Sequence, residues 1–173
     1  MRRSERQHVA RALAGAAGGL AGAFAMSRVP ALRRVDDRAT ALIAQAAADR
    51  VLHASLRRER LDRLIPLVRY SYGTMAGAAY GLLTDGSHVA STGAAWGAVL
   101  WVISDFVVLP VLASHPPRDP AGRTAVSLIA HVVYGVATGI VTCGICAAVV
   151  SSQSPDATPS TRAIGNWRRA VGS

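Results

Sequence analysis

The sequence predicts an all-α membrane protein, built as a four-helix transmembrane bundle with an amphipathic interfacial helix between the first and second spans. Three observations predict it. Hydrophobic residues make up 51% of the 173 residues and stand in long blocks, charged residues are nearly confined to the gaps, and glycines recur four apart in every block. The predicted membrane domain is 12–150, between a basic N-terminal tail (1–11) and a flexible C-terminal tail (151–173).

Each span is predicted from its length, because a hydrocarbon core about 30 Å thick needs roughly 20 mostly apolar helical residues. The blocks at 66–84, 89–113 and 125–150 meet this length clearly. The block at 12–29 is shorter and rich in Ala and Gly, and its Ala23-Phe24-Ala25 resembles a signal-peptidase site. We interpret it as a retained span, because it repeats the glycine spacing of the later ones.

Residues 35–65 predict one amphipathic helix. Apolar residues recur there at spacings of three, four or seven, with Asp, Glu and Arg between them. Such a helix lies in the membrane interface or caps the bundle from the water side. Both interpretations are open from the sequence.

The formal net charge is +9, and all 19 residues counted as Lys or Arg are arginines. The arginines border apolar spans, so we expect them to contact anionic headgroups of the lipid bilayer, and we expect no nucleic-acid partner. Their distribution favours the loops before the second and fourth spans facing the cytoplasm, while the basic N-terminal tail favours the opposite orientation. Abundant Ala, Arg and Gly without Lys is typical of a GC-rich bacterial genome, and we therefore expect a bacterial cytoplasmic (inner) membrane.

Glycines four residues apart predict close helix packing, because small residues let two backbones approach within a membrane. One such pair is weak evidence in a chain rich in Ala and Gly, but all four spans carry one. The predicted helix-packing glycines are Gly15, Gly19, Gly73, Gly77, Gly81, Gly93, Gly97, Gly135 and Gly139.

Three ionisable residues extend these glycine faces in steps of four. Arg69 precedes Gly73, Asp105 follows Gly97 by eight, and His131 precedes Gly135. At 1.5 Å per residue, Asp105 and His131 lie about 10 Å and about 8 Å inside their spans. An aspartate there is costly unless it faces protein or water.

We therefore expect a buried polar cluster in the bundle, in which tyrosine hydroxyls complete the hydrogen bonds. Its predicted members are Arg69, Tyr72, Asp105, His131 and Tyr134. A structural role in fixing helix register and a role in binding a solute or a proton are both open.

Other chemistry has little support in the sequence. Cys143 and Cys146 have a thioredoxin-like spacing, but they lie late in an apolar helix, where no helix N-terminus lowers a thiol pKa. Of the five histidines only His131 lies well inside a span, so no metal site and no haem or other cofactor is expected. We predict that the chain is not an enzyme.

The stretch from Tyr70 to Gly139 resembles the YagU-like family of uncharacterised bacterial multi-pass inner-membrane proteins. The likeness lies in Tyr72-Gly73, Gly77, Tyr80-Gly81, Ala95-Trp96-Gly97, Leu109-Pro110, His115-Pro116-Pro117-Arg118 and His131-Val132-Val133-Tyr134-Gly135. The family tends to place a histidine where this chain has Arg69. The resemblance implies a multi-pass membrane protein and no established activity.

Two functions follow from these expectations. The first is a membrane scaffold or accessory protein that self-associates into a homo-oligomer through a glycine face. The second is a proton or small-solute carrier or channel that uses the layer of Asp105, His131 and Arg69.

Overall fold

The computed structural model describes residues 3–51, 57–84, 88–112 and 121–152, and these residues are almost entirely helical. The helices are α1 (Arg3–Arg28), α2 (Pro30–Val51), α3 (Arg58–Leu83), α4 (Val89–Ile103), α5 (Leu109–Leu112) and α6 (Ala121–Ser152). A π-helical turn, η1 (Ser104–Val108), joins α4 to α5. Nearly all of the predicted C-terminal tail (151–173) lies outside the described residues.

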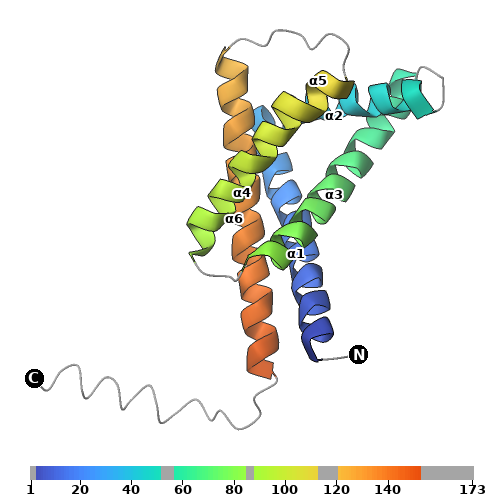
Figure 1. Cartoon of the computed structure of the whole chain (residues 1–173). Coiled ribbons are helices and arrows are strands. Elements are labelled where there is room, and N and C mark those ends of the chain that lie inside the picture. Colours follow the sequence, from blue (N-terminus) through green and yellow to red (C-terminus); the bar gives the residue numbers. More distant parts are fainter. Residues whose placement is uncertain (1–2, 52–56, 85–87, 113–120, 153–173) are drawn as a thin grey trace, which may run out of the picture.

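Four long helices form a bundle in which neighbours run antiparallel (Figure 1). α1 packs against α3 on one side and against α6 on the other, and α4 packs against α6. α1 and α6 therefore form the centre, while α3 and α4 flank it. α2 lies across one end, where it contacts α3, α6 and α5.

Three stretches within the described helices are long and apolar enough to cross a membrane, Glu5–Arg28, Val89–Val111 and Thr124–Val149, which indicates a membrane protein. The segment predicted as the second span lies in α3, which is not among them. Its first turns after Pro66 carry Arg69 and two tyrosines, which lower its mean hydropathy. Conversely, the shortest predicted span belongs to a helix that begins at Arg3, inside the predicted basic tail.

The prediction of one amphipathic helix over 35–65 is wrong in its extent. α2 ends at Val51, and residues from Arg58 onward belong to α3. Proline lacks an N–H and disfavours a helical conformation in the residue before it. Here α3 continues through Pro66, and both Pro66 and Asp62, whose carbonyl loses its helical donor, are exposed.

Small and hydroxyl-bearing residues fill the bundle, while large apolar residues face outward. The largest fully buried side chains are Tyr80 and Thr138, whereas Leu83 is 74% exposed and Met75 is 73% exposed. A soluble protein buries its large apolar residues. The opposite arrangement fits helices that pack closely against one another and are surrounded by lipid.

The helices approach closely at glycines. A Cβ atom on Gly19 of α1 would overlap the carbonyl oxygen of Gly73 and lie 2.8 Å from the Cα of Gly77 in α3. A Cβ on Gly97 of α4 would overlap the carbonyl oxygen of His131 in α6. All nine predicted packing glycines have backbone or side-chain atoms of another helix within 3.4 Å of such a position.

Candidate functional site

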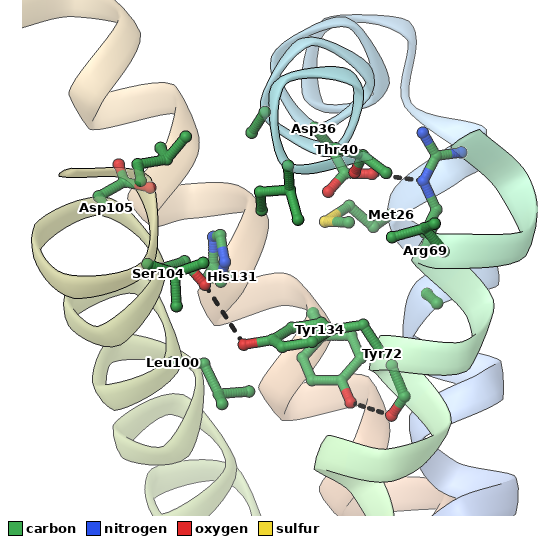
Figure 2. A pocket seen from close by; sticks show the side chains of 17 residues that line it. Met26, Asp36, Thr40, Arg69, Tyr72, Leu100, Ser104, Asp105, His131 and Tyr134 are labelled. Atoms are coloured by element: carbon green, nitrogen blue, oxygen red, sulfur yellow. Dashed lines mark hydrogen bonds and ion pairs between the residues drawn. The ribbon is translucent and has the colours of Figure 1, made fainter. Parts of the chain in front are cut away.

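A cavity of about 130 Å³ lies between α3 and the α4–η1–α5 segment. α1 and α6 stand behind it and α2 covers its end (Figure 2). Most of its lining is apolar, and the polar side chains come from α2, α3, η1 and α6. The lining residues are Ala23, Met26, Asp36, Ala39, Thr40, Ile43, Val68, Arg69, Tyr72, Gly73, Leu100, Ser104, Asp105, Val108, Leu109, His131 and Tyr134.

The structure brings all five members of the predicted polar cluster to this cavity. Arg69 and Tyr72 come from α3, Asp105 from η1, and His131 and Tyr134 from α6. Figure 2 shows Asp105 on one wall, Arg69 on the opposite wall, and His131 between them. The contacts among the five differ from those predicted.

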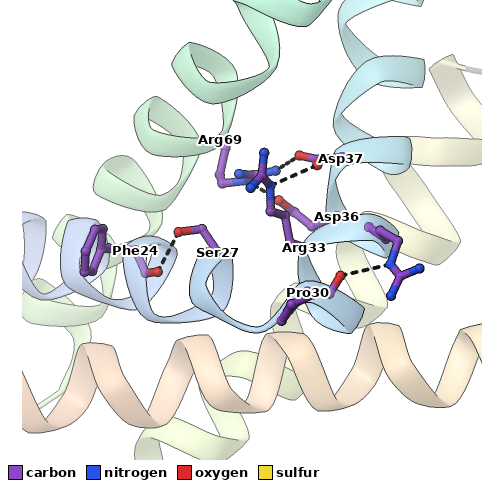
Figure 3. Close-up of polar contacts among 8 residues, drawn as sticks. Phe24, Ser27, Pro30, Arg33, Asp36, Asp37 and Arg69 are labelled. Atoms are coloured by element: carbon purple, nitrogen blue, oxygen red, sulfur yellow. Dashed lines mark hydrogen bonds and ion pairs between the residues drawn. The ribbon is translucent and has the colours of Figure 1, made fainter.

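Arg69 is paired with α2 and not with Asp105. Its Nε bonds to the carboxylate of Asp36 and its terminal nitrogen to that of Asp37, and the arginine is only 8% exposed (Figure 3). Asp37 also contacts Arg33 at 3.4 Å. Arg69 is therefore not bonded to another member of the predicted cluster, because α2 folds over α3 and places two carboxylates beside the guanidinium.

Sequence reasoning missed Asp36, although a signal was present. Asp36, Thr40 and Ile43 are spaced four and three apart on one face of α2, and all three line the cavity. A carboxylate on the apolar face of an amphipathic helix indicates a buried partner. The sequence alone does not say which helix carries that partner.

Burial raises the pKa of Asp36 above its ordinary value of 3.8. The positive charge and the hydrogen bond of Arg69 act in the opposite direction, as does the nearby His131, but they do not outweigh the loss of hydration. Asp36 therefore holds a proton more readily than an exposed aspartate.

Asp105 lies half-buried in the π-helical turn and makes no hydrogen bond or ion pair with the residues that the structure describes. The turn ends where the N–H of Leu109 bonds to the carbonyl of Ser104. Pro110 follows, and it lacks the N–H that would bond to Phe106 in a regular helix. A π-turn widens the helix and reorients its side chains, and such turns are frequent at functional sites.

His131 has a defined hydrogen-bonding role. Its Nδ1 lies 2.9 Å from the carbonyl oxygen of Ser127, which only accepts hydrogen bonds. Nδ1 therefore carries a proton, and in the neutral imidazole Nε2 is left as an acceptor.

Two tyrosine hydroxyls join the walls of the cavity. Tyr134 on α6 is buried and donates to the carbonyl oxygen of Gly73 on α3 at 2.6 Å. The hydroxyl of Tyr72 on α3 is hydrogen-bonded to that of Ser104 at 3.3 Å. The first bond ties α6 to α3, and the second joins α3 to η1 (Figure 2).

Within the described residues, no three His, Cys, Asp or Glu side chains are grouped so that they could hold a metal ion. Cys143 and Cys146 are free thiols inside α6, far along the helix from its N-terminus. The described residues that line the cavity therefore offer polar and charged groups for binding.

A comparison of the chain with protein-family models, with curated proteins and with solved structures finds no match. The resemblance to the YagU-like family stays a prediction.

Proposed function

We propose that the chain is a multi-pass carrier that binds a small solute in the cavity between α3 and η1, within a bacterial cytoplasmic membrane. One observation carries the proposal. Every long helix, and α2 as well, contributes to a single cavity that holds Asp36, Arg69, Asp105 and His131. Ionisable residues at membrane depth are costly, and they commonly mark a pathway for ions or solutes.

The proposal includes four membrane-crossing helices, with α3 as the fourth. From Leu67 onward the exposed side chains of α3 carry no charge, and they include Leu67, Met75, Leu82 and Leu83. Its charged residue in that stretch, Arg69, is turned inward and neutralised. A helix of moderate hydropathy crosses a membrane when its polar groups face the bundle in this way.

In this arrangement α2 lies at the membrane interface. Arg33, Arg34 and Arg38 are exposed on it, while Leu32, Thr40 and Ala44 are buried against the bundle. At the C-terminal end of α1, just before α2, the guanidinium of Arg28 stacks over the ring of Phe24 at 4.3 Å. Arginines at this level meet anionic headgroups, which attract them by about 1 kcal/mol each.

The scaffold function has less support. The glycine faces expected to drive self-association are occupied by the chain's own helices. Gly15 and Gly19 meet α3, and Gly93 and Gly97 meet α6. A homo-oligomer would have to use a different surface.

Water access to the cavity tests the carrier function. We would replace Cys143 and Cys146 by Ala, introduce Ser104→Cys, and treat the chain in lipid vesicles with a small charged methanethiosulfonate. A carrier must admit water to Ser104, and the thiol should be modified because the reaction needs a hydrated thiolate.

Mass spectrometry would measure the modification of each thiol, and two further variants serve as controls. Thr138→Cys lies in the α1–α6 contact, where Thr138 is fully buried, and Phe106→Cys replaces a residue that is 61% exposed on the outer surface. We expect neither to react, because one is packed and the other faces lipid. Modification of Ser104→Cys as slow as that of Thr138→Cys would overturn the carrier function and favour a dry scaffold. Rapid modification of Phe106→Cys would contradict a lipid-facing position for η1.

A further inference from the structure

We infer that the solute is a small organic cation whose ammonium group binds Asp105, an inference that rests on the proposed function. The charges of the cavity carry it. Two carboxylates and one guanidinium line the cavity, and the guanidinium of Arg69 is already paired with α2. Asp105, on the opposite wall, has no such partner among the described residues.

This imbalance selects the sign of the ligand's charge. A half-buried carboxylate is stabilised by a cation that binds it directly, and it repels an anion. Two basic side chains line the cavity, Arg69 and His131. Arg69 is occupied by Asp36 and Asp37, and His131 uses Nδ1 on the carbonyl of Ser127. A cation therefore gains from this site, and an anion does not.

The hydrogen-bonding groups of the cavity favour a ligand that donates hydrogen bonds as well as one that is positively charged. His131 uses Nδ1 on Ser127, so in the neutral imidazole Nε2 is an acceptor. Ser104 precedes Asp105 in η1, and its hydroxyl is hydrogen-bonded to that of Tyr72 on α3. Both hydroxyl oxygens also have lone pairs that can accept a hydrogen bond. An ammonium group with N–H donors matches these acceptors better than a quaternary ammonium, which has none.

The walls select the rest of the molecule. Leu100, Val108 and Leu109 lie on one side of the cavity, Met26 behind, and Ile43 at its covered end. A bare metal ion would leave these apolar walls unused, and ions of that kind bind several oxygens. The volume of about 130 Å³ is close to that of engineered cavities that hold benzene. The rings of Tyr72 and Tyr134 add faces that attract cations.

A series of three probes of nearly equal size tests the inference. Benzylammonium, benzyl alcohol and benzoate differ in charge while sharing one ring. Binding would be measured by titration calorimetry on the chain in phosphatidylcholine nanodiscs, with empty nanodiscs as the blank. We expect benzylammonium to bind at least about tenfold more tightly than benzyl alcohol, and benzoate to bind weakest of the three.

Two Asp→Asn variants assign the effect to the cavity. Asp105→Asn should weaken benzylammonium binding about tenfold or more and leave benzyl alcohol unchanged, while Asp105→Glu should retain part of the preference. Asp49→Asn removes the same charge from an exposed position on α2 and should change nothing. Tm values of all variants would show that each one folds.

The inference fails if benzoate binds as well as benzylammonium, if Asp105→Asn and Asp49→Asn behave alike, or if none of the probes binds. Labelling of Ser104→Cys separates this failure from that of the proposed function. If Ser104→Cys is modified but the probes show no preference for a cation, the cavity is a water-filled site for another solute. If Ser104→Cys is also protected, the carrier function falls as well.

Discussion

Arg69 on α3 is neutralised by Asp36, which lies 33 residues earlier on α2. The ion pair fastens the covering helix to the bundle at the edge of the cavity. It also removes the one arginine of the cavity from reach of Asp105. The same contact thus holds the fold together and determines the charge that the cavity presents.

Removing Arg69 should destabilise the fold strongly. Arg69→Ala leaves the partly buried Asp36 without its partner, and we expect a loss of about 2–4 kcal/mol in the free energy of unfolding, because removing one member of a largely buried pair strands the other charge. Denaturation in mild detergent would measure it. Arg63→Ala, at an exposed position of the same helix, should change stability by less than about 0.5 kcal/mol. Equal effects of the two variants would show that the pair contributes nothing.

The pH dependence of stability should reveal the proton on Asp36. Because the fold raises the pKa of this carboxyl above 3.8, the folded chain binds its proton more tightly than the unfolded chain. Its contribution to stability therefore grows as the pH falls through the raised pKa, and it is fully present below 3.8.

The Tm of the natural chain minus that of Asp36→Asn should accordingly increase as the pH is lowered from neutrality toward 3.8. The corresponding difference for Asp49→Asn, at an exposed site, should stay nearly flat over that range. A difference for Asp36→Asn that shrinks on acidification would have the wrong sign.

Glycine contacts between helices should tolerate no added methyl group. Gly19→Ala places a Cβ on the backbone of α3, and we expect a loss of about 1–3 kcal/mol as α1 and α3 are forced apart. Gly144 is the matched control on α6, because a Cβ there meets nothing within 4 Å. Gly144→Ala should be neutral or stabilise by up to about 1 kcal/mol through helix propensity. Thermal unfolding of both variants checks this, and a Gly19→Ala chain as stable as Gly144→Ala would exclude a tight α1–α3 contact.

Local periodicity predicted which residues share a face. Residues four apart lie on one side of a helix, so the glycine spacing also indicated where Arg69, Asp105 and His131 would point. All three line the cavity. Positions along a single helix follow from its own sequence, and this part of the site was therefore predictable.

The partners of those residues were not predictable, because they depend on how separate helices dock. Nothing in the sequence around Arg69 says that α2 folds over it with Asp36 and Asp37. The π-turn at Ser104–Val108 was missed for a related reason. The effect of Pro110 on Phe106 was visible in the sequence, but the π-helical geometry of the whole turn was not, and neither was the contact of α5 with α2.

A cavity inside the membrane requires that α3 crosses the membrane. This helix is less apolar than the stretches Glu5–Arg28, Val89–Val111 and Thr124–Val149. Glu59 and Ser91 are exposed and flank this helix, one in its first turn and the other just after it, in α4. A membrane-impermeant maleimide would be applied to Glu59→Cys and Ser91→Cys in sealed, uniformly oriented vesicles of the chain lacking Cys143 and Cys146. Four crossings predict that one site reacts in intact vesicles and the other only after permeabilisation. Reaction of both sites from the same side would contradict a membrane-crossing α3, and with it a solute site between α3 and η1 inside the membrane.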